Sequence, residues 1–302
     1  MNERKLNFEK GNMEVLTLEE LERTHVENYR DGSPVGGIYH YDLIHFILDL
    51  LEKNRIGYKV KEIFAVDNRH GHNPGVTLHH DLEESFGIQA PETYTLRRVF
   101  ANINLESADD DMTNNLAVSY TQQGIAIGWG PFCYVCHNQT ICSSEHILSN
   151  YTLPGNSRIP TSERDTRFLL SRFSETFLKE IALAEQEISD VMALKDLRLD
   201  AKTVREFIGE ATICRTLVEA RNATVRQGRL YPISDANINR MVEALSESTL
   251  LDGCSGYELL NAANFYCKPR HSTFENIMPQ SLMIYQAISG YSKNGKFNFK
   301  VY

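Results

Sequence analysis

Hydrophobic residues recur every three or four positions in two stretches near the start of the chain. The first, residues 17–30, opens with Thr17 and Glu20 at the T-x-x-E spacing that caps the first turn of a helix. The second, residues 41–54, reads YDLIHFILDLLEKN and places its leucines and isoleucines on one helical face. The pattern therefore predicts two amphipathic helices.

After Gly57 the pattern changes to an alternation of apolar and polar residues, which is typical of strands. Glycine, proline and short polar runs separate the alternating segments, and Gly130-Pro131 is the break before the last of them. Five segments follow this pattern: residues 58–68, 93–105, 115–121, 124–130 and 132–141. They predict an antiparallel sheet of five strands.

The second half of the chain returns to helical spacing from Ser162 onward. Residues 162–197 contain neither glycine nor proline and keep apolar residues three and four apart. Further helices are predicted over residues 200–225, 234–248, 255–267 and 274–289. The expected fold class is α+β: an antiparallel sheet with N-terminal helices, followed by an α-helical C-terminal half packed on it.

The two halves meet at residues 151–162, YTLPGNSRIPTS, where two prolines, a glycine and serines mark a joint. We therefore expect a mixed α/β part with the antiparallel sheet over residues 1–153 and an α-helical part over residues 160–302. Because each part has apolar faces that only the other could cover, we expect one composite domain whose halves do not fold apart.

The composition is that of an ordinary globular protein, with 302 residues, 42% of them hydrophobic and 24% charged. No apolar run is long enough to cross a membrane and the first residues are charged, so we expect a cytoplasmic protein without a membrane partner. The net charge of −9 comes from the first half, whereas the last fifty residues carry more basic than acidic side chains. A polyanion would be attracted there, around Lys268 and Arg270, although a solvated tail explains the same charges.

The stretch GPFCYVCHNQTIC places Cys133 and Cys136 at the C-x-x-C spacing, which zinc knuckles, haem attachment sites and redox pairs share. Alternate side chains of a strand face opposite sides, so Cys133 and Cys136 are expected to point apart. No second C-x-x-C completes a tetrahedral zinc site, and no helix is predicted to begin beside Cys133 and lower the pKa of its thiol. We therefore predict buried strand thiols, with no metal, haem or other cofactor.

Two short motifs resemble a phage- and plasmid-borne family of unknown function. The strand GPFCYVCHNQTI is similar to the family's P-V-R-V-V-C-x-N-x-L strand, and the helix GYELLNAANFY to its W-x-x-x-N-A-V-T-E-Y segment. The matching positions are Pro131, Val135, Cys136, Asn138, Asn261, Ala262 and Tyr266. Cys133 stands where the family usually has Arg, and Tyr257 where it has Trp. The resemblance implies a mobile-element origin and a sheet-then-helices order.

One hypothesis is a metal-dependent enzyme, because imidazoles in the segment RHGHNPGVTLHH could gather on zinc or manganese. Such a site would use His70, His72, His79 and His80. The run Asp109–Asp111 could add Mg²⁺ ligands, but adjacent side chains diverge, and solvated loops are the commoner reason for both patterns. Because the sequence has no Walker A, G-x-S-x-G or H-E-x-x-H motif, NTPase or hydrolase activity is not expected.

The leading hypothesis is a phage or plasmid protein that binds single-stranded DNA in recombination or replication, without catalysis and as an oligomer. Arg97 and Arg98 lie on opposite faces of the predicted strand 93–105, so one of them can be exposed beside aromatic rings. Cations suit phosphates, and rings suit stacked bases. The residues expected to bind nucleic acid are Arg97, Arg98, Trp129, Tyr134, Lys268 and Arg270. A third hypothesis is a non-catalytic accessory or structural protein of a mobile element that acts through protein contacts.

Overall fold

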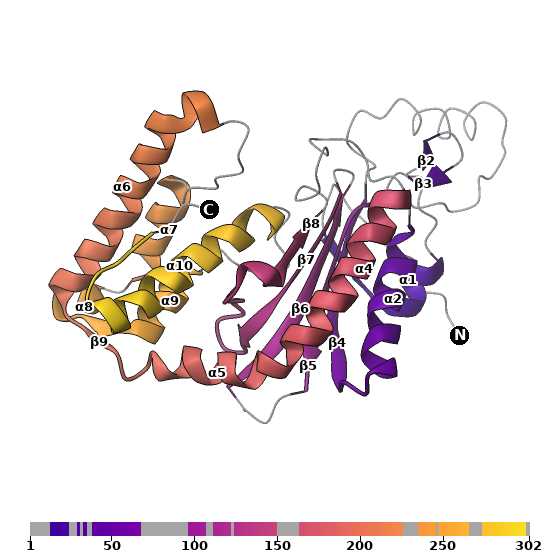
Figure 1. The fold of residues 1–302 in the computed structure, drawn as a ribbon, viewed down its shortest axis with the longest axis horizontal. Helices are drawn as coiled ribbons and strands as arrows, with labels where there is room; N and C mark the ends of the chain where they lie inside the picture. Colours follow the sequence, from indigo (N-terminus) through magenta and orange to yellow (C-terminus); the bar gives the residue numbers. More distant parts are fainter. Residues whose placement is uncertain are drawn as a thin grey trace. The chain divides into compact units, whose positions relative to one another are not determined.

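The fold is α+β, as the sequence predicts. The computed structural model describes residues 13–23, 29–30, 33–34, 38–67, 96–106, 111–121, 124–149, 163–225, 235–245, 247–265 and 274–299. Within these residues the chain forms a six-stranded antiparallel sheet in its first half and mostly helices in its second half (Figure 1).

Four ten-residue strands make up most of the sheet: β4 (Tyr58–Asp67), β5 (Leu96–Leu105), β6 (Met112–Thr121) and β7 (Gly124–Cys133). Two short strands, β1 (Met13–Leu16) and β8 (Ile147–Ser149), complete the order β1-β4-β5-β6-β7-β8. The four long strands therefore neighbour one another in chain order, as a meander. Their alternation is visible in the sequence, whereas β1 and β8 are too short to show it.

Two helices come from the N-terminal part of the chain. α1 (Leu18–Arg23) begins with the predicted capping box: the Thr17 N–H donates to Glu20 Oε2 at 2.7 Å, and the Glu20 N–H donates to Thr17 Oγ1 at 3.1 Å. α2 (His40–Lys53) turns its leucines and isoleucines into the core, where Leu43, Ile47 and Leu51 are completely buried. The helix predicted over residues 41–54 is confirmed as α2. The helix predicted over residues 17–30 is confirmed at Leu18–Arg23, whereas Tyr29–Arg30 form a short strand.

The described residues of the second half are mostly helical, and the helical segment predicted over residues 162–197 is interrupted. The segment from residue 162 to 197 contains two α-helices separated by a 3-10 turn at Ile181–Leu183. The helices are α4 (Glu163–Glu180), α5 (Ala184–Ala193), α6 (Ala201–Val225), α7 (Asp235–Ala244), α8 (Glu247–Asp252), α9 (Gly256–Ala263) and α10 (Phe274–Asn294).

The remaining elements among the described residues are one 3-10 turn and two short strand pairs. A 3-10 turn at Ser144–His146 leads into β8. β2 (Tyr29–Arg30) pairs with β3 (Ser33–Pro34), and β9 (Arg198–Leu199) pairs with β10 (Cys254–Ser255). The second pair brings together the segments that precede α6 and α9.

The chain clusters into two compact units. One contains Met1–Ile103, Ala117–Ala126 and Leu148–Ser174, and the other contains Asn104–Leu116, Ile127–Ile147 and Glu175–Tyr302. Each unit therefore takes segments from both of the predicted parts, 1–153 and 160–302. The joint at residues 151–162 lies outside the described residues, and independent folding of the two parts stays a prediction.

A search for membrane-spanning helices among the described residues finds none with the length and apolar character that a bilayer requires.

Candidate functional site

The first three turns of α4 separate buried from exposed side chains sharply. Leu169, Leu170 and Phe173 are at most 8% exposed, and Thr166 is also buried. These positions are three or four residues apart and form one side of the helix. The apolar side fixes how α4 packs and leaves the opposite side exposed.

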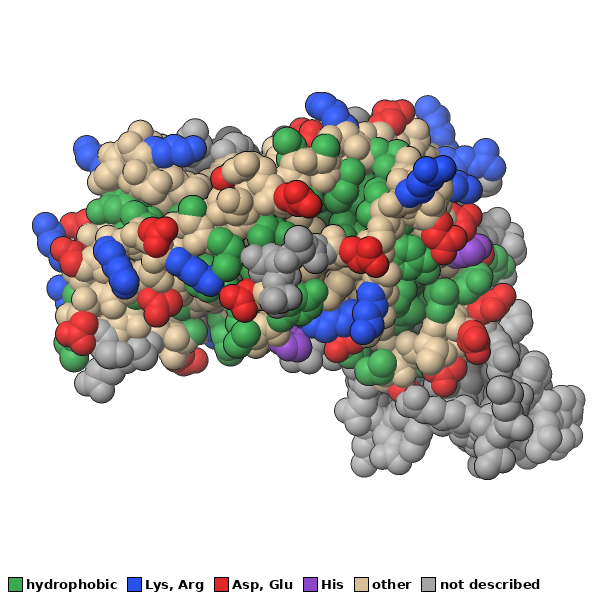
Figure 2. Space-filling view, turned by 90° about the horizontal axis from the view of Figure 1, so that it is seen from below, with side chains coloured by type: hydrophobic (Ala, Val, Ile, Leu, Met, Phe, Trp, Pro, Cys, Tyr) green, Lys and Arg blue, Asp and Glu red, His purple; other side chains and the backbone are tan. Residues whose placement is uncertain are grey.

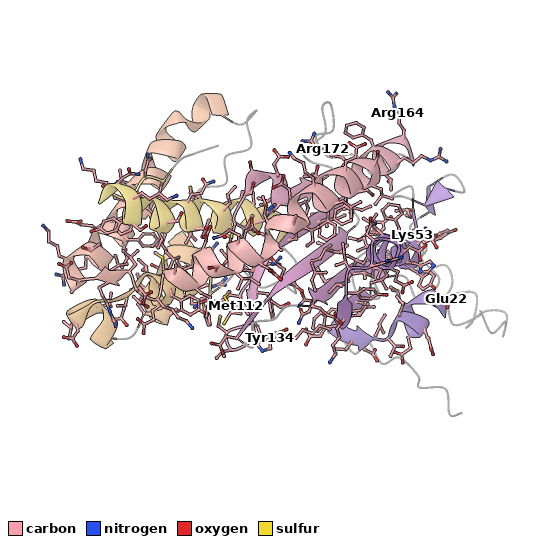
Figure 3. The ribbon with its side chains drawn as sticks, turned by 60° about the horizontal axis from the view of Figure 1, so that its bottom comes forward. Glu22, Lys53, Met112, Tyr134, Arg164 and Arg172 are labelled. Atoms are coloured by element: carbon pink, nitrogen blue, oxygen red, sulfur yellow. The ribbon has the colours of Figure 1, made fainter. Side chains whose placement is uncertain are left out.

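The exposed side of these turns combines cations with an aromatic ring. Arg164, Arg167 and Arg172 are exposed, and the Phe168 side chain lies among them and is 53% exposed. Residues 164, 168 and 172 are four apart, which places them on one helical face. In Figure 3, Arg164 and Arg172 extend outward from α4. We call Arg164, Arg167, Phe168 and Arg172 the α4 face.

Of the residues predicted to bind nucleic acid, Trp129 and Tyr134 are described in full. The Trp129 ring is 2% exposed and lies between His146, at 5.0 Å between ring centroids, and Phe177, at 5.5 Å. Because this core would have to open before a base could reach the ring, the stacking role predicted for Trp129 does not fit the structure. Tyr134 is 39% exposed, in the turn after β7. The side chains of Arg97, Arg98, Lys268 and Arg270 lie outside the described part of the chain.

The proposed metal ligands are mostly outside the described residues, which exclude His70, His72, His79, His80, Asp109 and Asp110. Asp111 is described, and its Oδ2 lies 3.5 Å from Lys195 Nζ. In α2, the buried His40 ring packs against Tyr120 in a tilted arrangement with 4.1 Å between ring centroids, and desolvation lowers the pKa of His40 to about 3. Within the described ranges, no group of three or more His, Cys, Asp or Glu side chains is arranged to hold a metal ion.

The two C-x-x-C cysteines lie in a turn, and the strand predicted over residues 132–141 is wrong. β7 continues past its Gly-Pro pair and ends at Cys133, and the next three residues form the turn. The His137 N–H donates to the Cys133 carbonyl at 3.0 Å, and the Cys133 N–H donates to the Asn138 carbonyl at 3.0 Å. His137 adopts a φ of 58°, a left-handed conformation that suits a chain reversal. Cys133 and Cys136 therefore share one tight turn and do not point to opposite faces of a strand.

The Cys133 sulfur is surrounded by hydrogen-bond donors. The Tyr257 hydroxyl donates to it at 3.5 Å, and the Cys136 side chain and the backbone N–H groups of Cys136 and Val135 lie close to it. Donors of this kind stabilise a thiolate relative to a thiol. The Cys136 side chain contributes most, and together these groups lower the pKa of Cys133 to about 5 although burial opposes them. The turn therefore holds a thiolate at neutral pH.

The second sulfur of the turn, that of Cys136, contacts α9. The Cys136 thiol lies 3.2 Å from Asn261 Oδ1, and Asn138 Nδ2 donates to the Asn261 carbonyl at 2.9 Å. The pKa of Cys136 is raised, first by its interaction with the neighbouring Cys133 sulfur and second by burial, which disfavours another thiolate. One thiolate and one thiol are therefore the favoured charge state of the pair.

The start of α9 is tightly fixed, which sets the position of the side chains that reach the turn. Ser255 and Glu258 form a capping box, with the Ser255 N–H donating to Glu258 Oε2 at 2.7 Å. The Gly256 N–H donates to the Leu197 carbonyl at 2.8 Å, and a side chain at Gly256 would press against Leu197. Tyr257 and Asn261, one helical turn apart on α9, are thereby held against the cysteine turn.

A buried histidine and carboxyl group meet elsewhere in the same unit. His146 Nε2 lies 3.5 Å from Glu187 Oε1, with the two side chains 1% and 15% exposed. Desolvation lowers the pKa of His146 to about 4, and it raises the pKa of Glu187 to about 8, with further contributions from the charges of Glu180 and Asp190. At neutral pH both members of the pair are therefore predominantly uncharged.

The sequence predictions missed two arrangements. The α4 face could have been found from the spacing of Arg164, Phe168 and Arg172, which is visible in the sequence. The C-x-x-C spacing is also visible in the sequence, but the turn that brings the two cysteines together is not, because hydrogen bonds connect it to α9, more than 120 residues further along the chain.

Neither a protein-family model, nor a curated protein, nor a solved structure matches this sequence.

Proposed function

We propose that this protein binds single-stranded DNA through the α4 face, as a non-catalytic protein of recombination or replication in a phage or plasmid. The observation that carries the proposal is the cluster of three exposed arginines around a 53% exposed phenylalanine on the first three turns of α4. The two motifs that resemble the phage and plasmid family agree with such a setting.

The chemistry of the α4 face suits a single strand. An arginine guanidinium presents several N–H donors to phosphate oxygens, and its charge displaces the counterions of the backbone. An exposed aromatic ring can stack an unpaired base whatever the base is. Arg164 and Arg172 are eight residues apart, about 12 Å along a helix, so they can contact different phosphates while Phe168 lies between them.

The DNA should contact only the α4 face and its immediate surroundings, because the face of the protein in Figure 2 has no broad basic surface. Lys and Arg side chains are interspersed with Asp and Glu on that face. The net charge of −9 also repels a polyanion at long range. We therefore expect moderate affinity that decreases steeply with salt and depends little on base sequence.

The test is the affinity for a fluorescein-labelled oligothymidine, measured by fluorescence anisotropy between about 50 and 200 mM salt. Replacing Arg164, Arg167 and Arg172 together by Gln should weaken binding and flatten the slope of log affinity against log salt by about 2, because each phosphate contact to a single strand contributes about 0.7.

The matched control removes the same formal charge elsewhere, by replacing Lys202, Lys293 and Lys296, which are all exposed, with Gln. This control should keep most of the affinity and slope. Equal losses in both triple variants would mean that only net charge matters, and no binding by the wild-type protein at about 50 mM salt would refute the proposal.

A further inference from the structure

Independently of DNA binding, we infer that Cys133 and Cys136 form a redox-active dithiol, which closes to a disulfide by exchange with a low-molecular-weight disulfide. Three observations carry this inference. The two sulfurs lie in one turn, a fixed set of hydrogen-bond donors surrounds one of them, and the turn is exposed.

The first argument is proximity. Cys133 and Cys136 are three residues apart in one turn, and Cys136 is the group that most lowers the pKa of Cys133, so the two side chains interact. The backbone of the turn is closed by the His137 N–H to Cys133 carbonyl bond at 3.0 Å, which keeps the two Cα atoms within one turn of chain. A disulfide needs Cα atoms roughly 4.4–6.8 Å apart, a separation that such a turn supplies.

The second argument is activation. Only a thiolate attacks a disulfide at a useful rate, and donors around the Cys133 sulfur favour its thiolate form. Tyr257 supplies one of these donors from α9, at 3.5 Å. Cys133 is therefore the attacking sulfur and Cys136 the one that closes the ring.

The third argument is access, and it also restricts the substrate. Val135, between the cysteines, is 85% exposed, and Cys136 is half-buried. Cys133 itself is only 5% exposed. A small, flexible disulfide can reach it along the exposed turn, whereas a disulfide within a folded protein surface would be held off by Val135 and Tyr134. The substrate class is thus a small disulfide such as that of glutathione.

The exchange balances without an additional oxidant. The Cys133 thiolate attacks one sulfur of R–S–S–R, a new S–S bond forms, and R–S⁻ leaves. The Cys136 thiol then gives its proton to the departing thiolate, and its sulfur attacks the Cys133 sulfur. The second R–S⁻ leaves and takes a proton from water. Two protein thiols are oxidised to one disulfide, and the small disulfide is reduced to two thiols.

A metal ion is a poorer occupant of the same turn. Zinc in proteins takes four ligands, most often thiolates and imidazoles. The side chains that approach the two sulfurs are Tyr257 and Asn261, and no third Cys, His, Asp or Glu joins them among the residues that the structure describes. Two neighbouring sulfurs with hydrogen-bonding partners favour redox chemistry.

The test uses the full chain, incubated in glutathione buffers of increasing disulfide fraction, trapped with an alkylating reagent, denatured and digested with chymotrypsin. Cleavage after Tyr134 separates Cys133 from the peptide that carries Cys136 and Cys142, so the two peptides stay together only if a disulfide joins Cys133 to one of these two cysteines, and the variants below identify which. We expect a joined pair in the wild-type protein, with two fewer alkylated cysteines than in the reduced protein.

Three variants make the result specific. Cys133→Ser and Cys136→Ser should each lose the joined peptides, and Cys136→Ser should instead accumulate a glutathione adduct on Cys133. The control Cys142→Ser changes a half-buried cysteine of the same unit, and it should oxidise like the wild-type protein.

The wild-type digest decides the question even if a variant folds poorly. No joined peptides at the highest disulfide fraction, or a disulfide that pairs Cys133 or Cys136 with any other cysteine, would overturn the inference. Because no DNA is present, this result is independent of the proposed DNA binding.

Discussion

Replacing Tyr257 by Phe should raise the pKa of Cys133, because it removes a single donor from the thiolate. The Tyr257 hydroxyl donates to the Cys133 sulfur at 3.5 Å, and the pKa of that sulfur is lowered to about 5. A hydrogen bond to a charged group contributes about 1.5–3 kcal/mol, and 1.36 kcal/mol corresponds to about one pKa unit. Because the bond is long, its contribution should lie near the lower end of this range, and we therefore expect the pKa of Cys133 to be about one unit higher in Tyr257→Phe.

The assay is the absorbance of the thiolate at about 240 nm between pH 3.5 and 8, taken as the difference from Cys133→Ser, since an ionised thiol absorbs where a neutral thiol does not. The matched control is Tyr285→Phe, which removes a hydroxyl that bonds to Cys142 and should leave the titration of Cys133 unchanged. A wild-type midpoint near the ordinary cysteine value of about 8.5 would refute the reasoning. So would an identical midpoint in Tyr257→Phe.

Two further predictions concern DNA affinity and pH-dependent stability. Phe168→Ala should lower the affinity for oligothymidine by the equivalent of about 1–3 kcal/mol at every salt concentration, and it should leave the salt slope unchanged. Fluorescence anisotropy measures both quantities, and an unchanged affinity would show that Phe168 does not stack a base. Because the pKa of Glu187 is raised to about 8, it adds stability that is complete below its ordinary pKa of 4.5 and is lost as the pH rises to about 8. The pKa of His146 is lowered to about 4, so His146 reduces the stability of the protein only as the pH falls below 6.5, the ordinary pKa of histidine. Between pH 6.5 and 8 the wild-type protein should therefore lose stability in urea unfolding, by at most about 1.4 kcal/mol per pH unit, and Glu187→Gln should lose less; equal slopes would contradict this.

Local signals predicted the parts of the fold that depend on local contacts. The capping box of Thr17 and Glu20 forms within four residues, and the alternation of β4 to β7 reflects strands that pair with their chain neighbours. The residues that form α2 also bury the leucines and isoleucines that the spacing predicts. In these segments the sequence pattern and the packing lead to the same element.

The cysteine turn could not be predicted because long-range contacts form it. Gly130 was expected to break the chain, but it lies inside β7, where the Thr140 carbonyl approaches so closely that a Cβ would collide with it. The actual reversal occurs without glycine or proline. It uses the left-handed conformation of His137 and is anchored by Asn138 to Asn261 on α9. The burial of Trp129 also depends on a contact that is distant in sequence, since the helix residue Phe177 lies edge-on to its ring.

The proposal that the α4 face binds single-stranded DNA is tested most directly by mapping where the strand lies. Oligothymidine in which iodouracil replaces some bases is bound to the full-length protein, irradiated and digested with trypsin, and the cross-linked peptides are identified by mass spectrometry. Iodouracil reacts preferentially with an aromatic ring on which it stacks, so the account predicts a cross-link within residues 168–172, at Phe168, that disappears in Phe168→Ala and is reduced by high salt. Cross-links confined to other parts of the chain, with none on α4, would contradict it.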